Sequence, residues 1–168
     1  MKINEQHPIA VFGTLRTLPE GQGNHHLMDG FIKRKIGFIP HLITTGIWTK
    51  LKPFSSMPVE IFWYDEKQYP ITIKQIDTLE GFNPNNPNKL GYIRSLYDVH
   101  LLPDDYEHPL FETNIRNIPE RDLEIDSKEW EKYQKVPCWV YTNQQVNYYN
   151  KLSRFSTNLI WEPLIGEI

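Results

Sequence analysis

Short apolar runs alternate with turn residues from residue 8 to about residue 103. This pattern is typical of an α+β domain whose strands are mostly antiparallel. In VEIFWYDE, residues 59–66, apolar side chains occupy both alternating faces, which favours a sheet with little exposed face, such as a small closed barrel. The predicted strands are Pro8–Phe12, Lys35–Ile39, Thr45–Trp48, Val59–Tyr64, Tyr92–Leu102 and Val136–Tyr141.

Four other stretches interrupt or follow this pattern. KLKPFSSMP at residues 50–58 and FNPNNPNKLG at residues 82–91 are rich in turn residues and predict surface loops. The polar, acidic segment 103–135 predicts an insertion or lid between two strands, because about 30 residues hardly support a core of their own. We therefore expect one domain over residues 1–168, with a helix and then an extended end in the tail 146–168.

Two segments predict helices beside the sheet. In YPITIKQIDTLEGF, Pro70 suits the first helical turn and Gly81 suits a C-terminal cap, so we expect a helix over residues 70–81. In DSKEWEKYQK, residues 126–135, Asp126 is a candidate N-cap. This second helix is strongly charged and should lie on the surface, anchored by its two aromatic residues, Trp130 and Tyr133.

The first helix carries a carboxylate at an unusual place. Ile73, Ile76 and Leu79 form an apolar stripe, and at 100° per residue Glu80 falls only about 40° from its centre. Burial would raise the pKa of Glu80 and suit it to carrying protons near neutral pH. Alternatively, Glu80 in the last turn swings out to solvent. The pattern leaves both conformations open.

Composition and charge narrow the class of protein. A net charge of −3 provides no overall attraction to nucleic acid or to acidic membranes. No run of about 18 apolar residues and no leader-like start is present, and the one cysteine, Cys138, fits a reducing compartment, so we expect a cytoplasmic protein. The adjacent His25 and His26 are poorly spaced as ligands, and we predict no metal site.

Three short motifs recur in a characteristic order. They are FGTLR at residues 12–16, IDTLEG at residues 76–81 and YIR at residues 92–94. Together they resemble the gamma-glutamylcyclotransferase-like family, whose members carry a Tyr-Gly-Ser/Thr-Leu turn, a Leu-Asp-x-Leu-Glu-Gly segment and a Tyr-x-Arg strand. The resemblance covers roughly residues 8–102 and, less securely, VPCWVYTN at residues 136–143.

This resemblance implies a fold and an activity. The fold is a small mixed, mainly antiparallel β-barrel with flanking helices and a site in a cavity at its mouth. Family enzymes need no cofactor and cyclise a gamma-glutamyl amine or amide to 5-oxoproline, releasing the amine. Glu80 matches the catalytic glutamate, a general acid/base. The turn that would hold the substrate comprises Phe12, Gly13, Thr14 and Leu15, followed by Arg16. Phe12 stands where the family has tyrosine, so that hydroxyl is missing, although the ring could still form a pocket wall.

Three further residues are candidate pocket residues with an alternative role each. Asn24 lies where the family often has asparagine and could line the pocket or cap a loop. Arg94 could bind a substrate carboxylate with both nitrogens or pair within the protein with Asp77 or Asp98. Tyr141 could reach the pocket or be a core aromatic residue.

Two functions are therefore open. The first is an enzyme with a small gamma-glutamyl substrate. The second is a binding module that keeps the pocket but only holds a small anionic metabolite or contacts another protein. In that module the acidic segment 103–135 would be the variable part.

Overall fold

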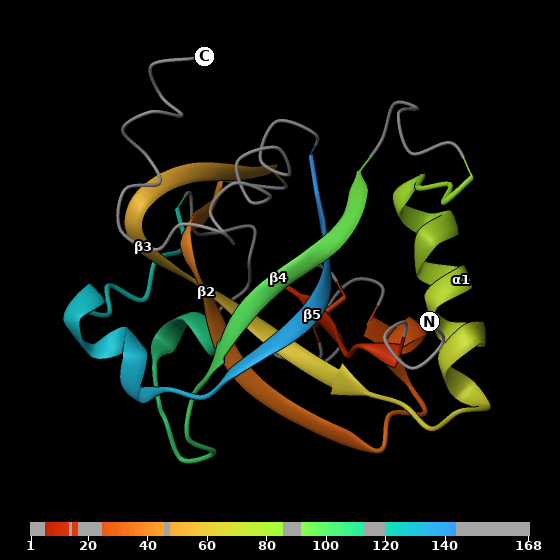
Figure 1. Ribbon diagram of the computed structural model, residues 1–168, viewed down its shortest axis with the longest axis horizontal. Helices are drawn as coiled ribbons and strands as arrows, with labels where there is room; N and C mark the ends of the chain where they lie inside the picture. The colour runs from red at the N-terminus through yellow and green to blue at the C-terminus, as the bar shows by residue number, and fades with distance from the viewer. Residues whose placement is uncertain are drawn as a thin grey trace.

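The computed structural model describes residues 6–13, 15–16, 25–45, 48–85, 92–112 and 120–143. Within these ranges, five strands close into a barrel in the order β1-β3-β2-β4-β5 (Figure 1). The strands are β1 Ile9–Val11, β2 Lys33–Thr45, β3 Trp48–Trp63, β4 Ile93–Leu101 and β5 Lys135–Thr142. The pair β1–β5 is parallel, with Ile9 opposite Trp139, and the other pairs are antiparallel. The prediction of an α+β domain with a mixed, mainly antiparallel barrel is confirmed.

The barrel buries apolar side chains on both faces of its sheet. One cluster takes side chains from every strand and fills the interior: Ala10, Phe12, Ile39, Leu42, Met57, Val59, Ile61, Tyr97, Val99, Cys138 and Val140. The outer-facing residues Phe62 and Tyr64 belong to a second cluster, which includes residues of helix α1, Gln68–Glu80. This explains the lack of a polar face in residues 59–64, since successive strand residues point to opposite sides and both sides are covered.

Helix α1 lies along one side of the barrel, and two short 3-10 helices lie on the opposite side (Figure 1). The predicted helix over residues 70–81 is confirmed to within two residues. Pro70 falls in its first turn, where a missing N–H leaves no bond unmade. Gly81 ends the helix in the left-handed conformation with φ of 73°.

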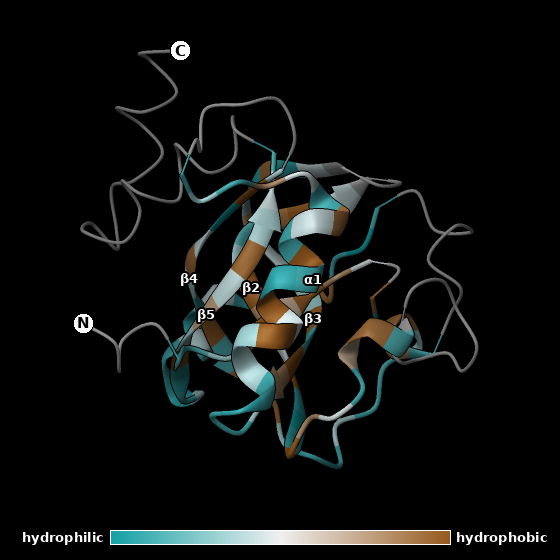
Figure 2. Cartoon of the chain, turned by 90° about the vertical axis from the view of Figure 1, so that its right-hand side faces the viewer, coloured by the Kyte–Doolittle hydropathy of each residue, from teal (hydrophilic) through white to brown (hydrophobic). Residues whose placement is uncertain are grey.

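The buried face of α1 differs from the predicted stripe. Its buried residues are Tyr69, Thr72, Ile76 and Asp77, whereas Leu79 is 44% exposed. Figure 2 views the helix from outside, and residues of both kinds are interspersed along it. Including Leu79 in the stripe was therefore wrong. The face turned to the barrel passes through Ile76 and Asp77 and reaches Glu80 one turn later.

The predicted loop at residues 50–58 is wrong, because these residues belong to β3. They pair with β2, and the register shifts between Pro40 and Leu42. At this irregularity His41 and Phe54 both have positive φ, and the Phe54 N–H donates to His41 Nδ1 at 3.0 Å. A bulge of this kind absorbs turn-forming residues without ending the strand.

The predicted strand Thr45–Trp48 is also wrong as a single element. Thr45 ends β2 and Trp48 begins β3, and the two residues pair with each other across the hairpin.

The segment between β4 and β5 covers the outer face of β2. It contains η3 (Pro109–Phe111) and η5 (Ser127–Lys132), whose apolar residues cluster with Ile36, Phe38 and Leu102. The predicted second helix is only this short 3-10 helix, because β5 already begins at Lys135.

The predicted cap and anchor of that helix are confirmed. The Asp126 side chain accepts the Lys128 N–H, and Trp130 is buried. The tail 146–168 lies outside the described residues. The helices in the described ranges are too short or too polar to span a membrane.

Candidate functional site

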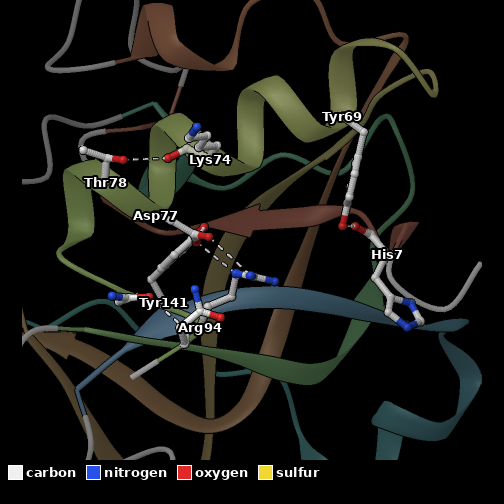
Figure 3. Close-up of polar contacts among 9 residues, drawn as sticks. His7, Tyr69, Lys74, Asp77, Thr78, Arg94 and Tyr141 are labelled. Atoms are coloured by element: carbon white, nitrogen blue, oxygen red, sulfur yellow. Dashed lines mark hydrogen bonds and ion pairs between the residues drawn. The ribbon is translucent and has the colours of Figure 1, made fainter. Parts of the chain in front are cut away.

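Three elements meet at one carboxylate on α1. Asp77 accepts hydrogen bonds from Arg94 of β4, with Nε 2.9 Å from Oδ1 and Nη2 3.3 Å from Oδ2. The Tyr141 hydroxyl on β5 donates to the same Oδ1 at 2.5 Å (Figure 3). Of the two partners considered for Arg94, the structure selects Asp77. Tyr141 is 3% exposed, and its hydroxyl is bonded to Asp77 within the protein.

Two aromatic rings hold Arg94 in place. Its guanidinium carbon lies 4.5 Å from the centre of the Trp139 ring and 5.2 Å from that of Phe82. Such contacts add to the ion pair when the cation is partly desolvated. Arg94 therefore uses its bidentate face on Asp77, and the structure favours a structural role for it over binding a substrate carboxylate.

Glu80 lies one helical turn after Asp77 and has a different environment. Its side chain is half-buried, and burial raises the pKa of Glu80 to about 7. Within the part of the chain that the structure describes, the carboxyl group has no hydrogen bond or ion pair. The sequence left a buried and a solvent-exposed conformation open, and in the structure the Glu80 side chain is half-buried.

Two tyrosines lie close enough to Glu80 for its negative charge to raise their pKa. The pKa of Tyr92 is raised by burial and by Glu80, and the pKa of Tyr141 is raised by burial, by Asp77 and also by Glu80. The Tyr92 N–H also donates to the Glu80 backbone carbonyl at 3.2 Å, which ties the start of β4 to the end of the helix. We call Asp77, Glu80, Tyr92, Arg94 and Tyr141 the α1 site.

The two carboxylates of the α1 site are suited to different tasks. Asp77 is held by a cation and a hydroxyl, so its charge is stabilised in one position. Glu80 has no such partner among the described residues and can take or release a proton near neutral pH. A carboxyl group with this property is a functional-site candidate, because a raised pKa from burial is what acid/base chemistry requires.

The turn after β1 lies beside the apolar cluster that packs between the barrel and α1. The Arg16 N–H donates to the Gly13 carbonyl at 3.0 Å and closes the turn. Leu15 is buried in the cluster that also contains Ile76 and Tyr141. The structure thus associates one candidate turn residue with the helix that carries Glu80, whereas Thr14 and Asn24 lie outside the described residues.

Gly13 has a different use from the one its sequence context suggests. A glycine ending a strand suggests backbone angles that other residues avoid, but Gly13 is not among the residues with positive φ. Apart from its two chain neighbours, no atom of the described residues lies within 4 Å of a Cβ built on Gly13. Among the described residues, the space beside Gly13 is therefore open.

Two other candidate residues of the turn point elsewhere. Phe12 is 8% exposed, and its side chain packs in the interior cluster of the barrel. The Arg16 side chain is 1% exposed, and its Nη2 donates to the Leu110 carbonyl at 3.0 Å. Within the described residues, none of the polar contacts of Arg16 is with the α1 site.

No protein-family model and no curated protein matches this chain.

Sequence reasoning missed some members of the α1 site. Asp77 entered only as a possible partner of Arg94, and Tyr92 only as a letter of the YIR motif. Both residues could have been predicted as site residues, because each lies inside one of the three short motifs. The aromatic support from Trp139 has no signal in sequence, since it depends on the pairing of β4 with β5.

Proposed function

We propose that this chain is a gamma-glutamylcyclotransferase-like enzyme in fold and activity. It would convert a gamma-glutamyl amine or amide to 5-oxoproline and a free amine, with Glu80 as general acid/base. The observation that carries the proposal is Glu80 itself. It is a half-buried carboxyl group with a pKa raised to about 7 and no bonding partner among the described residues, next to two tyrosines.

The reaction requires little more than a proton carrier and a fixed substrate shape. The alpha-amine of the glutamyl group attacks its own side-chain carbonyl carbon, which forms a C–N bond and breaks the amide C–N bond. An ammonium cannot attack, so Glu80 first removes one proton from it. The attacking nitrogen loses a second proton as the lactam forms, and the leaving nitrogen takes up both through Glu80 and departs as an ammonium. Atoms balance without water or a cofactor. Holding the substrate folded lowers the barrier further, because the reacting groups are already together.

The turn after β1 is the candidate for the remaining requirement of the reaction, which is a group that stabilises the negative charge formed during attack. Attack places negative charge on the carbonyl oxygen, which backbone N–H groups stabilise when they are already aimed at it. Such donors must be approachable, and among the described residues beyond its chain neighbours no atom lies within 4 Å of the position that a Gly13 side chain would take. Tyr141 and Arg94 bind Asp77 and so support the part of α1 that precedes Glu80.

An assay of 5-oxoproline release tests the proposal. The panel contains gamma-glutamyl amines, gamma-glutamyl amino acids and glutathione. Several compounds are needed because the residues that line the pocket select the leaving group, and the three motifs do not specify those residues. Glu80→Gln should lower kcat/KM by about a hundredfold to ten-thousandfold, the usual contribution of a general acid/base. The matched control is Glu66→Gln, an exposed carboxylate just before the helix, which should keep full activity.

The pH profile provides a second readout. Because Glu80 must be deprotonated to accept the ammonium proton, kcat/KM should rise with pH through about 7. Release that survives Glu80→Gln would contradict the mechanism. Tight retention of a gamma-glutamyl compound with no release from any panel member would instead support the binding module.

A further inference from the structure

Two histidines approach the ring of Trp130, where η5 packs on the barrel on the side away from α1 (Figure 1). The centre of the His41 ring of β2 lies 5.0 Å from that of Trp130, and the centre of the His100 ring of β4 lies 6.3 Å from it. Trp130 is 8% exposed, and its indole Nε1 donates to the Ile125 carbonyl at 3.1 Å. The residue that anchors η5 therefore packs against two titratable rings.

The backbone around His41 is irregular, and the His41 ring takes part in holding it. The register of the pair β2–β3 shifts between Pro40 and Leu42, so that His41 lies in a bulge opposite residues 52–55 of β3. His41 and Phe54 have φ of 68° and 66°, a conformation that side chains larger than glycine rarely adopt. The Phe54 N–H donates to His41 Nδ1 at 3.0 Å, so a ring nitrogen replaces a backbone carbonyl as acceptor.

This hydrogen bond fixes the protonation state of His41. Because Nδ1 accepts the Phe54 N–H, the neutral ring carries its proton on Nε2. A second proton can bind only at Nδ1, where it removes the lone pair on which the bond depends. His100 differs, because its Nδ1 lies 3.1 Å from the Trp130 carbonyl and donates to it, which leaves Nε2 for a second proton. Protonation therefore breaks this contact of His41 but keeps that of His100.

The surroundings of both rings favour the neutral form. Burial and the charge of His100 lower the pKa of His41 to about 4. Burial also lowers the pKa of His100, although its bond to the Trp130 carbonyl opposes this shift. Three exposed charged groups act on His100, one from each neighbouring element: Lys135 of β5, Glu131 of η5 and Asp98 of β4. The lysine lowers the pKa further, and the two carboxylates raise it.

Other charged groups near the bulge of His41 have partners of their own. On β3, Lys52 lies within the bulge and pairs with Glu120 at 3.6 Å. In the segment that follows Glu120, the Asp122 carboxylate accepts the Ser56 N–H at 2.9 Å. Both carboxylates are therefore already bound by other groups.

We propose that His41 is an acid-sensitive latch that holds η5 on the barrel. A proton on Nδ1 breaks the bond to Phe54, two N–H groups then face each other, and the ring turns out to solvent as the bulge opens. Trp130 thereby loses the His41 ring from its packing, so η5 detaches more readily. Detachment exposes His100 as well, and its protonation further favours the open state. The latch does not depend on the proposed reaction.

The lowered pKa of His41 gives the direction and the size of the effect. The open state binds the proton more strongly than the closed state, so acid favours opening. With a pKa of 6.5 when open and about 4 when closed, neutral His41 contributes fully to closure above pH 6.5, and this contribution is lost as the pH falls towards 4. Between pH 7.5 and 5.5, the population of the open bulge should rise about tenfold.

Hydrogen exchange of single N–H groups, followed by NMR on the full chain, tests the latch. The protection factor of the Phe54 amide, corrected for the intrinsic exchange rate at each pH, should fall about tenfold from pH 7.5 to 5.5. The Trp130 indole N–H should lose at least as much protection, because its exposure frees both histidines. The Trp139 amide, bonded to the Pro8 carbonyl between β5 and β1, is the internal control and should stay protected.

Two results of this measurement would overturn the proposal. The first is constant protection of Phe54 over this pH range. The second is a loss at Phe54 that does not extend to the Trp130 indole, because His41 would then open the bulge without releasing η5.

His41→Asn is the matched variant. Asparagine tolerates positive φ and can accept the Phe54 N–H with its side-chain oxygen, but it does not titrate. Protection of Phe54 in this variant should therefore be the same at pH 7.5 and 5.5. His26→Asn makes the same replacement at an exposed position of η2 (His25–Met28) and should keep the tenfold loss. A loss that persists in His41→Asn would contradict the latch.

A direct titration keeps the test decisive if His41→Asn does not fold. The NMR signals of the His41 ring in the wild type should show its proton on Nε2 at pH 7.5 and a pKa well below 6.5. A proton on Nδ1, or a pKa of about 6.5, would overturn the proposal.

Discussion

The α1 site and the cluster formed by Glu60, Arg16, Arg34 and Arg121 (the arginine cluster) are both largely buried groups of charged residues. Carboxyl groups are the more numerous among the named residues of the first, and arginines among those of the second. The α1 site holds two carboxyl groups and one arginine, and the cluster of Arg16, Arg34 and Arg121 holds one carboxylate, Glu60. A surplus carboxyl group can lose its charge by taking a proton, as the raised pKa of Glu80 shows. An arginine keeps its charge at neutral pH, so its burial has to be offset by the groups that bind it.

The two regions also distribute their partners differently. At the α1 site, two nitrogens of Arg94 bind Asp77, and none of the hydrogen bonds of Arg94 is to Glu80. In the arginine cluster, Glu60 is shared between Arg16 and Arg34. Loss of one arginine should therefore affect the two regions unequally.

The largest expected effect is the difference between Arg94→Met and Arg16→Met. Arg94→Met leaves Asp77 charged and nearly buried, which should lower the free energy of unfolding by about 3 kcal/mol. Arg16→Met leaves Glu60 paired with Arg34, and an apolar side chain replaces a poorly satisfied cation, so the loss should be about 1 kcal/mol or less. Urea unfolding at neutral pH measures both. Equal losses would break the comparison.

The next effect should appear in the pH dependence of stability. The pKa of Glu80 is 4.5 when unfolded and about 7 when folded, so the unfolded chain loses this proton first as the pH rises. The contribution of protonated Glu80 to stability is complete below pH 4.5 and is lost as the pH rises through 7. Glu80→Gln removes this dependence.

The measurement is urea unfolding of the wild type and Glu80→Gln at several pH values. The stability of Glu80→Gln relative to the wild type should increase between pH 4.5 and 7 and stay level above that range. Glu66→Gln, at an exposed position, serves as the control and should show no such increase. A constant difference between Glu80→Gln and the wild type would show that Glu80 is solvated.

The smallest expected effect concerns the hydroxyl of Tyr141. Tyr141→Phe removes one hydrogen bond to Asp77 but leaves Arg94 in place, so it should cost about 1 kcal/mol. Combining it with Arg94→Met in a double-mutant cycle should show a coupling, because both side chains bind the same oxygen. Additive losses would indicate that the two contacts are independent.

The elements predicted best are those with a strong local signal. Helix α1 has Pro70 in its first turn and Gly81 as its cap, and both signals act within a few residues of the chain. The loop predicted at residues 50–58 failed because long-range pairing with β2 outweighed local turn preferences at Ser56 and Pro58. Leu79 was misplaced because a helical stripe predicts a face but not the direction from which the barrel approaches it.

The sequence by itself determined the class of the fold and the helix that carries Glu80. These follow from periodicities and caps that operate inside single elements. Only the tertiary structure decided that Arg94 pairs with Asp77 and that Arg16 and Arg121 lie within each other's field. Such partners come from separate elements, and close packing around the barrel, which no local pattern encodes, brings them together.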